Sequence, residues 1–544
     1  MIAWTEMHPL VSSALALLPV LGYAEIHYRM QLLPSRLYMR WPEILADVPF
    51  RLEPHAPLPV LLLVKDAHRF PVILEKVELK IWENGKAILS RELLEGAVAI
   101  TQPWWEKLIP VDLPEKPETT LQVNVVFHAR RGKKQKVFVN DNYPQLSHRP
   151  FEVIRSGEPL PLFPGQFAGD LHTHSRYTSD QVEFGASLTA VRAMGKAVGL
   201  HFAAITDHSY DLDDHHHNFL RNSRHLEKWR AFQHEVARLN HNQDGFLLIP
   251  GEEVSARNAG GRTVHFLVLN SQDFFPGSGD GAERFFHSRS ELSVAEILEA
   301  LPDSALAAAA HPGVSAPRLE RLLLRRGNWS GEDLSRPRLD GLQAVNGTGD
   351  GSLAEGLKMW GQLLLSGKRS FLYGGNDAHG NFNRYRQIHL PFWSMAEHTD
   401  HIFGKMRTVL STGARPKSPE DAVSALRRGA SYVTTGPALQ VRVSSGGKSG
   451  SFGSTVGGRD FTIDVRVKSS GEFGPIETVR LIWGDFAKRK ETEIRNFRPK
   501  LVFQFAETLR FSPKSPGYLR VEVVSGNEGN RFFAWGNPIW LEPG

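Results

Sequence analysis

The sequence predicts an α/β core built on a parallel sheet, of the barrel kind, flanked by two small β-sandwich domains. Three observations predict this. Over residues 51–160, short runs rich in Val, Ile and Leu are separated by Pro, Gly and charged turns. Over residues 165–440, short apolar runs alternate with helical stretches, which is typical of a parallel α/β core. From residue 441 to 544, short strands and turns return.

The length supports the same division. With 544 residues the chain is too long for one typical core, and about 150 residues per domain gives about three domains. The expected organisation is an N-terminal arm or helix at 1–50, an immunoglobulin-like β-sandwich at 51–160, the α/β core at 165–440 and a second β-sandwich at 441–544.

The N-terminal arm contains an apolar run at residues 10–24. The residues before it include Glu6 and no Lys or Arg, whereas a secretory signal begins with a positive segment. The run is also short for a membrane span and contains Pro19 and Gly22. We expect a docked helix or irregular arm and no stable membrane span, with a poor signal or anchor as the alternative.

Composition sets limits on partners and compartment. The net charge of +5 arises from 64 basic and 59 acidic residues, which is too balanced to predict nucleic-acid binding. Cysteine is absent, so any metal site must use His, Asp and Glu. The absence of cysteine fits the cytoplasm, which is the expected location, and it is also compatible with export. The expected partner is a small-molecule substrate, and the oligomeric state stays open.

Single elements can be read within these segments. Residues 72–82 (VILEKVELKIW) alternate apolar and polar side chains in part, as a half-buried strand does. Residues 156–166 are rich in Pro and Gly and predict a linker. Ser418, Pro419 and Gly429 predict a helix that has a serine N-cap, proline in its first turn and a glycine at its end.

The stretch 169–180 (GDLHTHSRYTSD) carries the first candidate metal ligands. His172 and His174 occupy alternate positions, so in an extended chain both imidazoles leave from one face and reach one cation. Asp180 follows six residues after His174. A pair of this kind also arises by chance in a chain with 23 histidines, so the motif alone leaves the metal and structural interpretations open.

Further metal-type side chains follow the apolar runs downstream. With the first three they make nine candidate ligands: His172, His174, Asp180, His208, Glu253, His265, His311, Asp377 and His379. A buried imidazole or carboxylate costs free energy unless it is paired or bound to a metal, and functional sites of α/β folds lie at strand ends. Taken singly, His208 and His311 are equally well explained as turn or core histidines, and His265 as a structural histidine within a strand.

In this order and over about 165–440, the motifs HTH, TDH, GEEVS, VHFLVL, AHPG and NDAH resemble the PHP (polymerase and histidinol phosphatase) family. The segment SYVTTGP and the flanking β domains resemble its carbaryl-hydrolase-like branch. The resemblance implies a distorted (β/α)7 barrel of PHP type. It also implies two or three divalent metal ions per chain. Imidazole suits Zn and Fe and carboxylate suits Mn, so the mixed ligand set leaves Mn, Zn and Fe as the candidates.

The resemblance also implies how the ligands divide. The first metal would take His172, His174, Glu253 and Asp377, the second Glu253 as a bridge with His265 and His311, and the third Asp180, His208 and His379. The chain departs from the family pattern at Asp180. Many relatives have an SDG sequence with Asp five residues after the second His, whereas here the interval is six and Gln181 follows. Asp207 and Glu252 adjoin predicted ligands and are expected to orient them.

The expected chemistry is metal-assisted hydrolysis, with no separate Ser or Cys nucleophile. A phosphoesterase acting on a small phosphorylated substrate is the leading function. The alternatives are an amide, ester or carbamate hydrolase and a non-catalytic binding protein. His208, His379 and Asp377 are the candidate catalytic groups, the two histidines foremost as acids for the leaving group. Arg384 and Arg386 are candidate phosphate contacts, or else ordinary loop charges.

Overall fold

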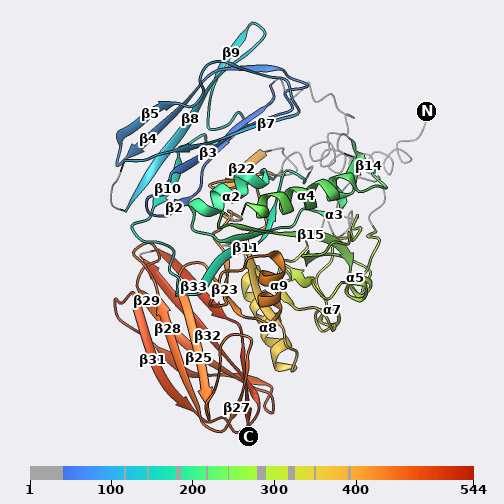
Figure 1. Ribbon diagram of the computed structural model, residues 1–544, viewed down its shortest axis with the longest axis vertical. Helices are drawn as coiled ribbons and strands as arrows, with labels where there is room; N and C mark the ends of the chain where they lie inside the picture. Colours follow the sequence, from blue (N-terminus) through green and yellow to red (C-terminus); the bar gives the residue numbers. More distant parts are fainter. Residues whose placement is uncertain are drawn as a thin grey trace, which may run out of the picture.

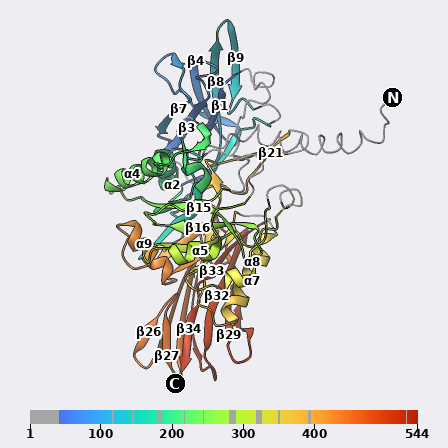
Figure 2. The same ribbon diagram turned by 90° about the vertical axis from the view of Figure 1, so that its right-hand side faces the viewer.

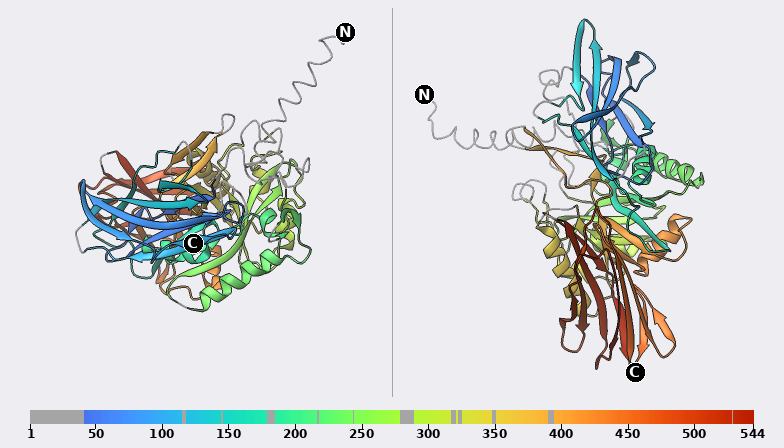
Figure 3. Two further views of the ribbon diagram at one scale, coloured as in Figure 1. Left: turned by 90° about the horizontal axis from the view of Figure 1, so that it is seen from above. Right: turned by 90° about the vertical axis from the view of Figure 1, so that its left-hand side faces the viewer.

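The structure is a computed structural model. It describes residues 41–544 except 115–117, 144–145, 179–184, 216–217, 243, 279–288, 317–320, 322–324, 348–350, 390–393 and 528. The predictions for the apolar run at 10–24 and for Asp180 therefore lie outside the described residues. Three parts follow one another along the long axis, with the N-terminal strands at one end, the helices around the middle and the C-terminal strands at the other end (Figure 1). Figure 2 and the right-hand view of Figure 3 show the same order.

The N-terminal part consists of two sheets around one apolar core. One sheet has the order β1-β3-β7 and the other β2-β10-β8-β4-β5, with β6 and β9 paired to β4 and β8. The strands are β1 (Glu43–Asp47), β2 (Arg51–Leu52), β3 (Leu58–Lys65), β4 (Val72–Glu83), β5 (Lys86–Glu92), β6 (Val98–Ile100), β7 (Trp104–Val111), β8 (Thr119–Arg131), β9 (Lys134–Val139) and β10 (Phe151–Arg155). Val77, Leu79 and Ile81 of β4 are fully buried in this core, as their alternation predicts. The first strand, β1, falls inside the segment expected to be an arm.

The central part contains most of the helices. Its strands are β11 (Gln166–His174), β12 (Phe202–Ile205), β13 (Asp214–His215), β14 (Asn218–Asn222), β15 (Leu247–Arg257), β16 (Thr263–Leu269), β17 (Leu306–Ala310), β18 (Gly341–Asn346), β19 (Phe371–Gly375), β20 (Ala378–His379), β21 (Tyr385–His389), β22 (Ser394–His398), β23 (Arg407–Ser411) and β24 (Ser431–Thr434). Its helices are α2 (Leu188–Ala197), α3 (Ser209–Leu212), α4 (Glu227–His241), α5 (Val294–Ala300), α7 (Gly331–Leu334), α8 (Ser352–Leu365) and α9 (Pro419–Arg427).

The expected (β/α)7 barrel is wrong. The sheet runs β19-β18-β17-β16-β15-β12-β11-β23-β24 and then continues into C-terminal strands, so it is a curled open sheet and not a closed barrel. β16 is antiparallel to both β15 and β17, and β23 is antiparallel to β11. Only residues 258–262 separate β15 from β16, which is too short for the crossover that parallel strands need. The chain is mostly β as a result.

The C-terminal part extends the central sheet. Its strands are β25 (Ala438–Ser445), β26 (Lys448–Gly450), β27 (Thr455–Gly458), β28 (Phe461–Lys468), β29 (Ile476–Asp485), β30 (Lys490–Phe497), β31 (Gln504–Phe511), β32 (Gly517–Asn527), β33 (Asn530–Gly536) and β34 (Ile539–Pro543). The separate sheet β26-β25-β28-β31 packs against strands joined to the central sheet through the β24–β33 pair. One apolar cluster includes Val441 and Ile463 of this part together with Val191 and Phe232 of the central part. The hydrophobic core is therefore continuous between the central and the C-terminal part.

Curling brings the end of β19 back to β11. The amide of Asp377 donates to the carbonyl of His172 at 2.8 Å. A Cβ atom on Gly375 would lie 2.6 Å from the Cβ of His172, so this approach requires glycine. The edge strand β19 thus meets β11, an interior strand of the same sheet, at the His172–His174 segment.

The predicted helix at 418–429 is confirmed as α9. The Ser418 side chain accepts a hydrogen bond from the Asp421 amide, Pro419 begins the helix, and Gly429 follows it with φ +67°. Among the described helices, none has the length and apolar character that a membrane crossing requires.

Candidate metal centre

Eight of the nine predicted ligands lie together at one end of the strands of the central sheet, which we call the ligand edge. Strands β11, β12, β15, β17, β18 and β19 end at or pass this edge, and the antiparallel β16 begins there. β11 carries His172 and His174, β15 carries Glu253, β16 carries His265 and β20 carries His379, while His208, His311 and Asp377 follow β12, β17 and β19. Carboxyl ends of parallel strands share an edge, which explains why residues far apart in sequence converge.

Glu253 lies at the centre of the cluster, with a side chain that is 1% exposed. Its Oε1 is 2.7 Å from His265 Nδ1 and 3.1 Å from His311 Nε2. Its Oε2 faces three further imidazoles, at 3.1 Å from His208 Nδ1, 3.5 Å from His172 Nε2 and 3.5 Å from His174 Nε2. One buried carboxylate therefore faces five imidazoles from both of its oxygens.

Asp377, between β19 and β20, faces two of these imidazoles. Its Oδ1 lies 3.1 Å from His174 Nε2 and 3.3 Å from His172 Nε2. Asp377 has φ +52° and His311 has φ +31°, a left-handed conformation that non-glycine residues adopt at some cost in free energy. Such strain collects at functional sites, where surrounding contacts fix it.

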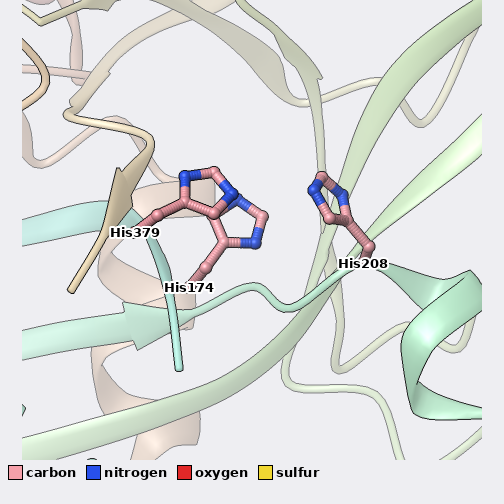
Figure 4. A group of neighbouring side chains, drawn as sticks. All are labelled: His174, His208 and His379. Carbon is pink, nitrogen blue, oxygen red and sulfur yellow. The ribbon is translucent and has the colours of Figure 1, made fainter. Parts of the chain in front are cut away.

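Three overlapping groups of these side chains could hold a metal ion: His172, His174, Glu253 and Asp377; Glu253, His265 and His311; and His174, His208 and His379. Metal–ligand bonds of roughly 2.0–2.2 Å place the donors around one cation about 3–4 Å apart. Most of the contacts around Glu253 and Asp377 have this spacing. Figure 4 shows the third group, in which the rings of His174 and His379 are stacked at 3.9 Å and His208 approaches from the other side.

Polar partners fix which nitrogen of His172 and His174 carries a proton. Gln343 Oε1 accepts the His311 amide at 3.0 Å and lies 3.2 Å from His172 Nδ1, so that nitrogen must donate. Thr178 Oγ1 donates to Asp207 at 2.8 Å, which leaves it to accept from His174 Nδ1 at 3.4 Å. In the neutral rings, both Nε2 atoms then direct lone pairs at the carboxylates.

His379 is oriented in the same way. Its Nδ1 lies 3.1 Å from the carbonyl oxygen of Asp377, which can only accept. The Nε2 lone pair is therefore available for a cation, and this buried atom has no hydrogen-bond partner among the described residues. Oriented lone pairs around a buried carboxylate are the arrangement that a metal centre requires.

The charges in the cluster are strongly coupled. Burial would raise the pKa of Glu253, but His265 and His172 hold it well below its usual range. Burial would likewise raise the pKa of Asp377, but His172 and His174 hold it well below. For His172, burial lowers the pKa, yet Asp377 and Glu253 raise it to about 9. The two carboxylates are thus ionised at neutral pH and favour a positive charge between them.

Residues outside the ligand set hold the edges of the site together. Asp207, predicted to orient ligands, accepts hydrogen bonds from the amides and hydroxyls of Ser175 and Thr178. Glu252 points away from the cluster and accepts from Ser209 Oγ and the Phe275 amide. Burial raises the pKa of Glu252 to about 8.

Three buried residues of this kind, Gln343, Asp170 and Asn376, were not predicted from the sequence. Gln343 serves His172 and His311, as described above. Asp170 accepts the amides of His172, Asn376 and Gly404 and the side-chain amide of Asn376, which joins β11 to the turn after β19. In the sequence, the one available signal is that each of them lies next to or within an apolar strand.

Replacement of Gln343 tests this orientation. Gln343→Leu should lower the affinity for the cation bound by His172 by about 10–100-fold, because the Nδ1 proton and the His311 amide lose their acceptor. Gln343→Glu keeps an acceptor oxygen and should retain most of the affinity. Competition titration with a chelator measures both variants. Equal affinities in the wild type and the Leu variant would contradict the role of Gln343.

The structure places the two candidate phosphate contacts, Arg384 and Arg386, against the N-terminal part. Arg384 donates to the carbonyls of Arg149 and Pro150 and stacks on Phe151, at 4.9 Å from the ring centre. Arg386 donates to the carbonyl of Ala46. Both guanidinium groups are buried against the N-terminal sheets and are not available to a substrate at the cluster. The chain before Arg384 turns away from the cluster to reach these partners.

Comparison with known proteins gives no family. No family model and no curated protein matches the chain. It is similar to a solved protein from Archaeoglobus fulgidus, at 12% identity over 18% of this chain and 91% of that one, with a TM-score of 0.14. It is also similar to a glycosyl hydrolase family 2 member from Bacteroides cellulosilyticus, at 12% identity over 93% and 63% of the two chains, TM-score 0.16. For the beta-glucuronidase of Bacteroides uniformis the identity is 12% over 92% and 61%, TM-score 0.17.

The comparisons correct the family assignment. This chain spans less than two thirds of the length of the two glycoside hydrolases, and TM-scores this low carry no argument about function. The PHP assignment is wrong, because the closed barrel that it implies is absent from the described residues and no family model matches the chain. The phosphoesterase expectation is withdrawn with it, because it depended on that resemblance and on Arg384 and Arg386.

Proposed function

We propose that this protein is a metal-dependent hydrolase that binds two or three divalent cations at the cluster around Glu253. The observation that supports this is the carboxylate of Glu253, which is buried and faced by five imidazoles. A buried carboxylate is costly unless it is paired with a positive charge, and a bound cation supplies that charge while the imidazoles stay neutral. The fit of the residues to a cation therefore supports the proposal independently of any family.

The donor set narrows the choice of metal. Imidazole nitrogens with carboxylate oxygens suit Zn, Mn and Fe, and the chain has no cysteine to supply a thiolate. His172, His174 and Asp377 would hold one cation with Glu253, and His265 and His311 would hold a second through the other oxygen of Glu253. His208 and His379, with His174, would hold a third. Divalent cations in such a site supply a nucleophilic water near neutral pH and polarise the electrophile.

The protein's own groups would complete the reaction. The pKa of His208 is lowered by burial but raised overall by Glu253, so this ring retains a proton better than its neighbour His311, whose pKa is lowered by burial. When only the first two cations are bound, so that His208 is not a ligand, we assign it the role of proton donor to the leaving group. Asp377 Oδ1, held near His172 and His174, would orient the attacking water. His379 has its lone pair directed inward and would act as a ligand.

The electrophile that fits best is an uncharged acyl group, as in an ester, amide or carbamate. The cations would have to balance the negative charge of a phosphoester in addition to that of Glu253 and Asp377. The two arginines expected to balance that charge are bound to the N-terminal sheets. An acyl substrate develops one negative charge, which a cation can stabilise.

Metal analysis and a substrate panel test the proposal. The purified protein should contain at least two divalent cations per chain and should hydrolyse p-nitrophenyl acetate or a p-nitrophenyl carbamate after reconstitution with Zn²⁺ or Mn²⁺. Bis-p-nitrophenyl phosphate and p-nitrophenyl β-glucoside are the comparison substrates and should react slowly. Protein that takes up no divalent cation would refute the proposal, and faster cleavage of the phosphate would refute the substrate class.

Cation binding should also be pH-dependent. Because the pKa of metal-free His172 is about 9, this ring is protonated at pH 7 and must lose its proton to a cation. The apparent affinity should therefore rise about tenfold per pH unit per released proton from pH 7 and level off above pH 9. Calorimetric titration in buffers of different ionisation enthalpy counts the protons. An affinity that is constant from pH 7 to 9 would contradict the protonated state of His172.

A further inference from the structure

The loop that follows the candidate ligand His379 is bound to the N-terminal sheets. Phe382 donates its amide to Asp47 Oδ2 at 3.1 Å and accepts the Phe50 amide at 2.9 Å. Asn383 donates its side-chain amide to the carbonyl of Glu152 at 2.8 Å. These bonds join residues more than 200 positions apart, so they belong to the docking of two parts of the molecule and not to a local turn.

The contacts continue along the next residues. The two arginines that lie away from the cluster, Arg384 and Arg386, donate to carbonyls of the N-terminal part, and Arg386 Nε lies 3.7 Å from Asp141 Oδ2. Arg384 is 4% exposed and Arg386 7%. Each residue from 382 to 384, together with Arg386, therefore has a polar contact with the N-terminal sheets.

Asp47 is the side chain at the centre of this contact. It is fully buried, and its two oxygens accept the amides of Phe382 and Val48. Burial raises the pKa of Asp47 to about 6, and Arg386 opposes that rise. A buried ionised carboxylate is retained at neutral pH only where such partners stabilise it.

We propose that the N-terminal β-sandwich is a positioning element of the metal centre, in which Asp47 holds the 380–386 loop and thereby fixes His379 over His174. His379 pairs with His174 through only the short strand β20, so its position depends on how the chain leaves that strand. Asp47 is a positioning residue, since it acts through the loop. The inference rests on the proposed function and adds a role for a part of the chain that contains none of the eight gathered ligands.

Two substitutions at one position separate positioning from charge. Asp47→Ala removes the acceptor of the Phe382 amide. It should lower the affinity for the cation held by His174, His208 and His379 by about 10–100-fold, with the affinities for the other cations unchanged. Asp47→Asn keeps a carbonyl oxygen for that amide and should recover most of the affinity. Glu75→Ala is the matched control, because the described contacts of Glu75, with Arg130 and Gln135, lie within the same sandwich and away from the loop.

Titration of the full-length metal-free protein with Co²⁺ measures the effect, through the number of ions bound and the absorption spectrum of each. We expect Asp47→Ala to lose one spectral component and the Asn and Glu75 variants to retain it. If Asp47→Ala does not fold, Asn383→Ala removes the adjacent bond to Glu152 and should give the same loss. Wild-type binding in a folded Asp47→Ala or Asn383→Ala protein would overturn the inference. Absence of Co²⁺ binding by the wild type would instead refute the metal centre itself.

Discussion

Glu253→Gln should remove more than one cation from the chain. Both oxygens of Glu253 face imidazoles, and two of the three candidate groups contain it. Glutamine keeps the shape but has no charge and only one acceptor oxygen, so neither group retains its shared anionic ligand. Activity should fall by more than the roughly 100-fold that loss of an outer partner causes. Elemental analysis after dialysis and initial rates on the acyl substrate measure the two losses.

The adjacent residue provides the control. Glu252 lies on the same strand and is equally buried, but it points away from the cluster and binds Ser209 and Phe275. Its pKa of about 8 means that it is largely protonated at pH 7, so Glu252→Gln replaces one neutral group with another. This variant should keep its cations and most of its activity. Equal losses in both variants would indicate a general disturbance of β15 and would contradict the central role of Glu253.

The strands of the central part were visible in the sequence, but their directions were not. Apolar runs predict burial, and parallel and antiparallel strands buried on both faces have the same pattern. The decisive signal was the loop at 258–262, which contains Gly260 and Gly261 between two apolar runs and is typical of a hairpin. If this loop is taken as one more connection of an α/β repeat, the sequence predicts a barrel. Instead, β15 and β16 form an antiparallel pair within a mixed sheet.

The candidate ligands could be predicted because their chemistry is unusual for their position. Imidazoles and carboxylates at the ends of apolar strands are costly to bury, and strand ends at one edge converge. Gln343 and Asp170 could not be found in this way, since a single Gln or Asp near a strand is common. Their roles depend on contacts with residues far away in the sequence, such as the bond from Asn376 to Asp170.

Arg384 and Arg386 lie near the candidate ligands in the sequence but away from them in the structure. Arg384 and Arg386 follow the NDAH motif closely, and proximity in sequence suggested that they reach the substrate. Between them and the cluster, the chain turns at Gly380, which has φ +65°, and then docks on the N-terminal sheets. Distance along the chain thus predicted the neighbourhood of the residues but not the direction of their side chains.

Asp377→Asn should remove one cation and leave the group of Glu253, His265 and His311 able to bind. Asparagine tolerates the left-handed backbone at this position, φ +52°, so the turn should persist while the charge is lost. His172 and His174 would then share only Glu253 as an anionic ligand. Without Asp377 the pKa of His172 should fall, because that carboxylate is the main group that raises it. Activity should decrease by more than roughly 100-fold, since the variant loses a ligand and not an outer partner.

The number of cations bound per chain distinguishes Asp377→Asn from Glu253→Gln, which should lose more cations. Asp340→Asn is the control, because Asp340 lies at the other end of β18 and accepts the Ala307 amide at 2.9 Å. Its replacement should cost about 1 kcal/mol of stability without loss of any cation. Thermal unfolding with and without added Zn²⁺ reports both effects, since a bound cation stabilises only the folded state. A full complement of cations in Asp377→Asn would show that this carboxylate is not a ligand, and the attacking water would then need another partner.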